Sequence, residues 1–421
     1  MAASGSYLRR VVDAELMQRL ASVGAVSIEG PKACGKTETA RQIRASEVRL
    51  DVEPEALRAA QINPALILDG KVPRLIDEWQ LVPEIWNHVR RAVDDRGSPG
   101  QFILTGSAVP ADNKTRHTGA GRISRLRMRP MALFESGGSS GAVSLDALLN
   151  SSGISTCNSE FDLSHIIELI CRGGWPALLG LSVKDACQGT QDYLEEIRRT
   201  DINEVEGSRR DPEKVGRLLR SLARNVATSV SVSTLAADVE GPDGSVDRHT
   251  VADYLAALSR LFVVEDQPAW QPHLRSRYTL RKAEKRHFVD PSLAVAALRA
   301  SPSQLRQDLN LLGLLFESMV IRDLRVYSQP FAGHVLQYRD SDDLEVDAIV
   351  ESANGNWGAF EVKLGGSVNI ENGAQNLLTF AARVDTTKCG APKCLAVIVS
   401  SGYAYQRPDG VLVVPIGCLG P

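Results

Sequence analysis

The sequence predicts a multidomain α/β protein built on a P-loop parallel-sheet core, and three observations carry that prediction. A glycine-rich loop stands between an apolar run at residues 25–28 and a segment with helical periodicity. Strand-like and helix-like apolar runs then alternate up to residue 107, which is typical of a parallel sheet covered on both faces. The C-terminal part of the chain has the order helix, three strands, helix, strand, written αβββαβ below.

The glycine-rich loop has the pattern GxxxxGK[ST] in the strand-to-helix context that this pattern needs. Lys36 would reach the β and γ phosphates of a nucleotide, and Thr37 would place its hydroxyl on Mg²⁺. Backbone N–H groups of the loop would surround the phosphates. The residues expected to bind nucleotide here are Gly30, Pro31, Lys32, Ala33, Cys34, Gly35, Lys36, Thr37 and the helix residue Glu38. The alternative is a glycine-rich turn that binds nothing.

Two later strands are expected to complete this site. Residues 72–78 end in Asp77, which would hold Mg²⁺, and Glu78, which would act as the catalytic base that orients water. The strand at residues 101–107 ends in small polar residues, and Thr105 and Ser107 would lie at the same edge of the sheet and sense the γ-phosphate. The alternatives are an ordinary acidic strand end and an ordinary strand-to-loop exit.

A cation-rich segment follows at residues 114–129. Phosphoryl transfer needs positive charge near the developing negative charge, and in oligomeric ATPases a neighbouring subunit commonly supplies an arginine. Arg122 is the candidate for this catalytic role in trans, which implies a homo-oligomer. The alternative is a solvated basic loop or a loop that binds DNA phosphates.

Length and composition exclude several classes of protein. A chain of 421 residues suits roughly two to four domains. The formal net charge of −3 excludes a globally basic nucleic-acid binder. The chain has no long apolar run and no apolar region of a signal peptide near its start, so a cytoplasmic protein without a membrane partner is expected. The 7 cysteines are scattered without a CxxC pair, which indicates neither a zinc site nor a disulfide framework.

Several motifs together resemble one family, the prokaryotic predicted AAA+ superfamily ATPases described simply as ATP-binding proteins with a C-terminal domain of unknown function. The motifs are residues 30–37, Asp77-Glu78, Thr105-Gly106-Ser107, Gly121-Arg122, Met128-Arg129-Pro130-Met131 running to Glu135, and Gly173-Gly174-Trp175-Pro176. The resemblance implies an AAA+-type ATPase domain at residues 1–140 that uses ATP and Mg²⁺, with Arg122 where the family carries Gly-Arg. One departure is Cys34, at a position where the family is variable.

The middle of the chain is expected to be mostly helical. A Gly/Ser-rich stretch at residues 136–159 predicts a linker or a mobile surface segment, and periodic apolar positions after it predict a helical lid. Linker and lid together are expected to span residues 141–215. Over residues 216–290 the order helix, helix, turn, helix, hairpin predicts a winged helix. The candidates for DNA contact are Arg248, His249, Arg260, Arg281, Lys282 and Lys285. The alternative is a protein-docking module, because nearby acids dilute the positive charge.

Residues 291–421 carry a second group of chemically active side chains. A hairpin about Asn354-Gly355 would place Asp347 nearly opposite Glu361, with Lys363 on the same face. Two carboxylates and a lysine at one point can hold Mg²⁺ and activate water at a phosphodiester.

This order of motifs resembles the PD-(D/E)XK nuclease fold. The resemblance implies that Glu317, on the preceding helix, is an additional acid and that Gln375, on the following helix, is the glutamine often found there. Val346 departs from the pattern, which has Pro before the Asp. The alternatives are a salt-bridged, half-exposed sheet and a nuclease fold that is retained only for binding.

Two functions follow from these patterns. The first is an ATP-driven enzyme that processes or translocates DNA, with an additional DNA endonuclease activity if the C-terminal constellation binds metal. The second is a nucleotide-dependent switch or assembly protein that binds a protein partner and has an inactive nuclease-like fold.

Overall fold

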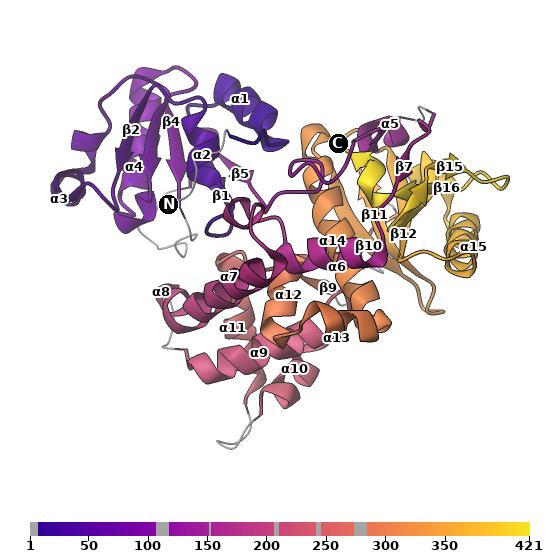
Figure 1. Cartoon of the computed structure of the whole chain (residues 1–421). Helices are drawn as coiled ribbons and strands as arrows, with labels where there is room; N and C mark the ends of the chain where they lie inside the picture. The colour runs from indigo at the N-terminus through magenta and orange to yellow at the C-terminus, as the bar shows by residue number, and fades with distance from the viewer. Residues whose placement is uncertain (1–6, 107–117, 151–152, 206–209, 241–245, 273–283) are drawn as a thin grey trace. The chain divides into compact units, whose positions relative to one another are not determined.

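The computed structural model describes residues 7–106, 118–150, 153–205, 210–240, 246–272 and 284–421 (Figure 1). The chain divides into two compact units. The first contains Met1–Pro130, Thr200–Arg209 and Ala257–Phe262, and the second contains Met131–Arg199, Arg210–Ala256 and Val263–Pro421.

The first unit is built on a five-stranded sheet whose strands are all parallel, as predicted. The strand order is β2-β3-β4-β1-β5. The bounds are β1 Ala25–Glu29, β2 Ser46–Arg49, β3 Arg74–Asp77, β4 Phe102–Thr105 and β5 Ile123–Arg127. Because parallel strands end at one edge, the residues that follow β1, β3 and β4 meet at the same side of the sheet.

Helices cover both faces of this sheet. Successive residues of a strand point to opposite faces, so neighbouring residues of β1 contact different helices. Val26 and Ile28 of β1 pack in one apolar cluster with α1 (Val12–Ser22) and α2 (Lys36–Arg41). Ala25 belongs to the other cluster, which contains side chains of α3 (Pro54–Ile62) and α4 (Ile85–Arg96). The sheet is therefore the middle layer of three.

The helical part of the second unit precedes its large sheet. Helix α12 (Pro291–Leu298) packs on α6 (Leu163–Arg172), α7 (Val183–Glu196) and α9 (Pro212–Arg224). The predicted order of three helices and a hairpin is present in α9, α10 (Val232–Val239), α11 (Arg248–Arg260), β8 (Val264–Gln267) and β9 (Lys285–Phe288), although α11 contributes residues to both units. Among the described residues, no helix combines the length and the apolar character needed to cross a membrane.

The C-terminal part of the second unit is a mixed sheet in the order β10-β11-β12-β13-β16-β15. The predicted αβββαβ order is present as α14 (Leu309–Tyr327), β10 (His334–Arg339), β11 (Glu345–Glu351), β12 (Trp357–Lys363), α15 (Ser367–Arg383) and β13 (Cys394–Val399). Strands β16 (Leu412–Pro415) and β15 (Tyr405–Gln406) extend the sheet. Antiparallel β11 and β12 pair Ala348 with Phe360, and continuing this register by one residue sets Asp347 opposite Glu361.

The linker or mobile surface segment predicted at residues 136–159 is corrected, because described parts of this stretch pair with strands of the second unit. Strand β6 (Val143–Ser144) pairs with β17 (Leu419–Gly420), and β7 (Asn158–Ser159) pairs with β14 (Gly402–Tyr403). The Ser139 hydroxyl also donates to the Leu419 carbonyl at 2.6 Å. Small residues here permit close backbone pairing rather than flexibility.

The expectation that the cysteines form no disulfide is also corrected. Cys157 and Cys418 are disulfide-bonded across a sequence separation of 261 residues. The two cysteines are brought together by pairing between strands that lie far apart in the sequence, so cysteine spacing could not indicate the bond.

Candidate functional site

The phosphate loop joins β1 to α2 in the first unit. A side chain at Gly30 would place its Cβ 2.2 Å from the Met128 carbonyl oxygen, so the close approach of the chain to β5 requires glycine. Gly35 has a φ of 102°, in the left-handed region that glycine adopts readily. Lys36 is buried, and its Nζ donates to the carbonyls of Gly30 at 2.9 Å and Pro31 at 2.7 Å. The ammonium is therefore held against the loop.

Three side chains meet beside this loop as the sequence predicts. The hydroxyls of Thr37 and Thr105 both donate to Asp77 Oδ1, at 2.9 and 2.6 Å. The pairing of Asp77 with Thr105 in the β3–β4 register places these two side by side. Asp77 is buried, and within the described part of the chain no lysine or arginine pairs with it. A carboxylate and hydroxyl oxygens of this kind are ligands suited to Mg²⁺, so these residues fit the ion that the motif implies.

Glu78 lies directly after β3 and has a left-handed backbone, with φ 55° and ψ 41°. Its side chain accepts a hydrogen bond from Gln80 Nε2. The Gln80 amide lies against Gly106, where an added Cβ would come 2.2 Å from Gln80 Oε1. Gln80 is a residue that sequence reasoning missed, and it can orient the carboxylate proposed as the base. Strained backbone of this kind is a feature of functional sites.

A buried arginine before the first strand fastens the phosphate loop, and sequence reasoning also missed it. Arg10 donates from Nη1 to the Cys34 carbonyl at 2.8 Å and from Nη2 to the Arg129 carbonyl at 2.7 Å. One guanidinium thus connects the loop to the chain that follows β5. Arg10 is a positioning residue, because these two hydrogen bonds go to backbone carbonyls of the loop and of the chain after β5.

We expect Arg10→Met to raise the KM for ATP by about tenfold while changing kcat less. The physical reason is that a hydrogen bond from a charged donor contributes about 1.5–3 kcal/mol, and its loss leaves the loop less well ordered for phosphate. Steady-state kinetics would measure the effect. The neighbouring Arg9 is exposed, so Arg9→Met is the matched control. Equal KM values for the two variants would contradict the role of Arg10.

Other residues predicted in the nucleotide site have different surroundings. Lys32 forms an ion pair with buried Asp201 at 2.6 Å, so this loop side chain contacts the π-helical turn Ile197–Asp201. Glu38 is largely exposed and pairs with Arg41 at 2.6 Å. Ser107 lies outside the described residues.

Arg122 lies at the opposite edge of the sheet from the phosphate loop. It immediately precedes β5, and its carbonyl accepts from the N–H of Ala25, the first residue of the parallel strand β1. Its guanidinium pairs with Asp94 at 2.8 Å and is about half exposed. Arg122 therefore does not reach the phosphate loop of its own chain, and the role in trans stays a prediction.

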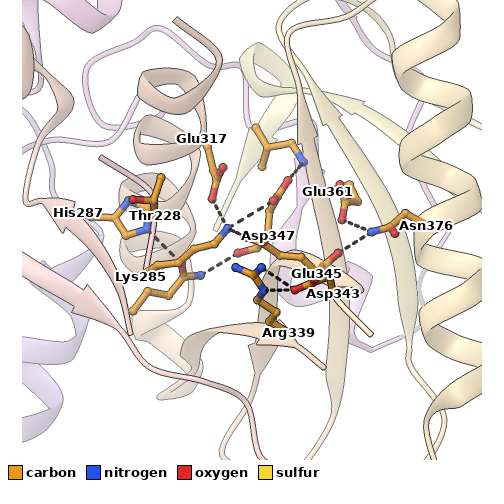
Figure 2. A network of polar contacts seen from close by, with 12 residues as sticks. Thr228, Lys285, His287, Glu317, Arg339, Asp343, Glu345, Asp347, Glu361 and Asn376 are labelled. Carbon is orange, nitrogen blue, oxygen red and sulfur yellow. Dashed lines mark hydrogen bonds and ion pairs between the residues drawn. The ribbon is translucent and has the colours of Figure 1, made fainter. Parts of the chain in front are cut away.

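The second unit contains a cluster of carboxylates around one lysine (Figure 2). Lys285 Nζ of β9 lies 2.8 Å from Glu317, 2.5 Å from Glu345 and 3.6 Å from Asp347. This position corrects the prediction that Lys285 contacts DNA, because its side chain is buried and surrounded by negative charge. The sequence places Lys285 in a basic segment, whereas in the structure it belongs to β9 and its side chain points into the protein interior.

The other side of the cluster contains Lys363. Its Nζ lies 2.6 Å from Glu361 and 3.6 Å from Asp347, so the predicted meeting of these three residues is present. Asn376 Nδ2 donates to Glu361 Oε1 at 2.8 Å, whereas Gln375 is exposed. The prediction of Gln375 is therefore wrong by one helical position, and Asn376 is the residue that was missed.

Burial and mutual repulsion shift the pKa values in this cluster. Burial and the negative charge of Asp347 raise the pKa of Glu317 and that of Glu361 to about 8 each. Burial lowers the pKa of Lys285, but the three surrounding carboxylates outweigh burial and raise that pKa above its ordinary value. Lys285 is thus an ammonium ion at neutral pH.

The predicted metal site at Asp347 and Glu361 does not fit the structure. In the described parts of the chain, no group of three or more His, Cys, Asp or Glu side chains could hold a metal ion. The carboxylates of Asp347 and Glu361 face Lys363, as the sequence predicts, but Asp347 also lies 3.6 Å from the ammonium of Lys285, which the prediction did not include. Two ammonium groups therefore lie beside the carboxylates that Mg²⁺ would need, and they repel a divalent cation.

The remaining DNA candidates are on or after α11. Arg248, His249 and Arg260 are exposed on that helix. Arg281 and Lys282 lie outside the described residues. DNA contact by these five residues stays a prediction.

Comparison with known proteins agrees with the geometry of the first unit. Residues 22–136 match an AAA domain. This AAA domain contains the phosphate loop, Asp77, Glu78 and Thr105, so an AAA-type, ATPase-like domain is present and supports nucleotide binding and hydrolysis. Residues 163–304 and 312–419 match two domains of unknown function, DUF8612 and DUF4143. The nuclease-like prediction is not tested by the second of these matches.

Two relatives are similar to nearly the whole chain and not to the AAA domain alone. The uncharacterised proteins Rv2008c of Mycobacterium tuberculosis and Mb2031c of Mycobacterium bovis are each 24% identical over 412 residues, covering 97% of this chain and 83% of theirs. Among solved structures, the Walker-type ATPase PABY2304 of Pyrococcus abyssi is similar with a TM-score of 0.42 and 13% identity, covering 68% of this chain and 94% of that chain.

Proposed function

We propose that the protein binds ATP with Mg²⁺ at the phosphate loop, hydrolyses it, and uses the nucleotide state to control a macromolecular partner. The observation that carries this proposal is the convergence of Thr37 and Thr105 on Asp77 beside Lys36. These are a cation, a carboxylate and two hydroxyls at the edge of the sheet where the strands end.

The residues of the site have distinct roles in this proposal. Lys36 leaves the carbonyls of Gly30 and Pro31 to contact the β and γ phosphates. Thr37 and Asp77 would hold Mg²⁺, which would neutralise charge on the phosphate oxygens. Glu78, oriented by Gln80, accepts a proton from the attacking water. Thr105 and, with it, Ser107 would contact the γ-phosphate.

The location of Arg122 supports a contribution across subunits. It lies at the sheet edge away from its own phosphate loop and is about half exposed. In a homo-oligomer, such an arginine can stabilise the negative charge at a neighbouring copy's nucleotide.

DNA is the partner that the sequence patterns favour, and its effect on hydrolysis tests the coupling. We expect purified protein to hydrolyse Mg-ATP, and we expect duplex or single-stranded DNA to stimulate the rate at moderate salt, where phosphate contacts are not fully screened. Steady-state phosphate release with and without each DNA measures both effects. Absence of hydrolysis under all conditions would contradict the ATPase proposal itself.

A second candidate function is a nucleotide-dependent switch that binds a protein partner. The observation that favours it is the burial of Lys285 among the carboxylates of the second unit. Because Lys285 is buried, the predicted DNA-contacting surface has one cation fewer. Its positive charge also offsets part of the negative charge of the predicted nuclease site. Hydrolysis that is indifferent to every DNA would favour this candidate.

A further inference from the structure

The carboxylate cluster of the second unit is arranged around an ammonium group of the protein itself. Figure 2 shows Lys285 reaching from β9 toward Glu317 of α14 and toward Glu345 and Asp347 of β11. The lysine side chain is only 4% exposed, and Glu317 and Asp347 are buried with it, whereas Glu345 is 36% exposed. A buried charge of this kind is retained only when it is paired.

Asp347 and Glu361 also have partners other than Lys285. Asp347 Oδ2 accepts from the Val362 backbone N–H at 2.8 Å and lies 3.6 Å from Lys363 Nζ. The two oxygens of Glu361 face Lys363 at 2.6 Å and the Asn376 amide at 2.8 Å. A divalent ion placed here would stand beside two ammonium groups and would have to displace the existing donors.

We propose that Lys285 is a built-in cation that takes the place of a divalent metal in this cluster, which makes the C-terminal domain independent of metal. This inference departs from the Mg²⁺ site predicted from Asp347 and Glu361. It does not depend on the proposed ATPase function, because none of these residues belongs to the first unit.

The same lysine also joins two segments of the chain. It projects from β9, within the segment that matches DUF8612, into the sheet and helix of the segment that matches DUF4143. A metal ion could neutralise the carboxylates without making this connection. The lysine supplies one positive charge to these carboxylates and also connects the β8–β9 hairpin to β11 and α14.

Mn²⁺ binding to the nucleotide-free, full-length protein tests the proposal. In the wild type, we expect an Mn²⁺ titration that Asp347→Asn leaves unchanged, because Lys285 already fills the site. Lys285→Met keeps the length of the side chain but removes its charge. We expect this variant to have a lower melting temperature than the wild type. We also expect it to gain one Mn²⁺ site at the cluster, with an affinity at least about tenfold higher than that of the same cluster in the wild type. Adding Asp347→Asn to Lys285→Met should remove the new site, and Mn²⁺ should raise the melting temperature of Lys285→Met alone.

The exposed Lys393 provides the control, because it lies directly before β13, outside the strands and the helix that carry the cluster. Lys393→Met removes an equal charge and should create no Mn²⁺ site. Wild-type Mn²⁺ binding that is lost in Asp347→Asn would overturn the proposal, since the lysine would then coexist with or yield to the metal. A folded Lys285→Met chain without an additional site would overturn it as well. If Lys285→Met does not fold, the comparison of the wild type with Asp347→Asn still decides the question.

Discussion

Replacing Lys36 with alanine is expected to abolish ATP hydrolysis, with a loss of at least about a hundredfold in kcat/KM. The ammonium is the one positive group of the loop that the pattern directs at the β and γ phosphates, and removal of one such electrostatic contact typically costs about 10²–10³-fold. The ammonium group already lies at the loop, because Lys36 Nζ donates hydrogen bonds to the backbone carbonyls of Gly30 and Pro31. Exchanging these carbonyls for phosphate oxygens needs a change of side-chain conformation and no movement of the sheet.

The measurement is phosphate release as a function of ATP concentration, together with binding of a fluorescent ATP analogue. Lys71 is exposed on the same unit, so Lys71→Ala is a control of equal charge that should leave both unchanged. A melting curve separates loss of function from loss of folding, because Lys36→Ala leaves two loop carbonyls without their donor. Unchanged turnover in a folded Lys36→Ala protein would remove the phosphate-loop assignment.

Glu78→Gln is expected to preserve ATP binding and to slow hydrolysis by about a hundredfold or more. The amide keeps the shape of the side chain but cannot accept a proton from water, and general-base catalysis typically contributes about 10²–10⁴-fold. Asp77, the residue expected to hold Mg²⁺, is left intact, so nucleotide should stay bound. The variant should therefore retain ATP under conditions in which the wild type releases ADP.

The identity of the nucleotide retained after incubation, measured by chromatography, distinguishes this trapped state from simple loss of binding. Glu84→Gln is the matched control, because Glu84 is an exposed acid close in sequence, directly before the first residue of α4. If hydrolysis by Glu78→Gln stays at the wild-type rate, another group must act as the base. If ATP binding is lost instead, Glu78 has a structural role that the hydrogen bond from Gln80 alone does not describe.

Several parts of the site were predictable because local rules apply to them. Gly30, Lys36 and Thr37 are close in sequence, so a strand, a tight loop and a helix suffice to place them. Asp77 and Thr105 come from different strands, but parallel strands end at one edge of the sheet. The register of β3 and β4 then pairs these two residues directly. Asp347 and Glu361 face each other because the hairpin about Asn354-Gly355 sets their register.

Other parts were not predictable, because they depend on how elements pack. Residue 376 rather than 375 faces Glu361, since one position on a helix is a rotation of about 100° and the sequence does not fix how the helix turns on the sheet. Arg10 reaches Arg129 across 119 positions of sequence. Neither contact leaves a local pattern.

The sequence by itself predicted the residues of the nucleotide site proposed in the AAA domain, because the motif places the expected phosphate-binding groups within one strand, one loop and one helix. Only the tertiary structure decided the character of the second constellation. The acids of β11 and β12 alone suggest a metal site, but Lys285 comes from a separate hairpin and pairs with two of them, Glu345 and Asp347. The physical reason is that burial and pairing of charge depend on all elements packed around a point, and a local pattern records only the elements adjacent in sequence.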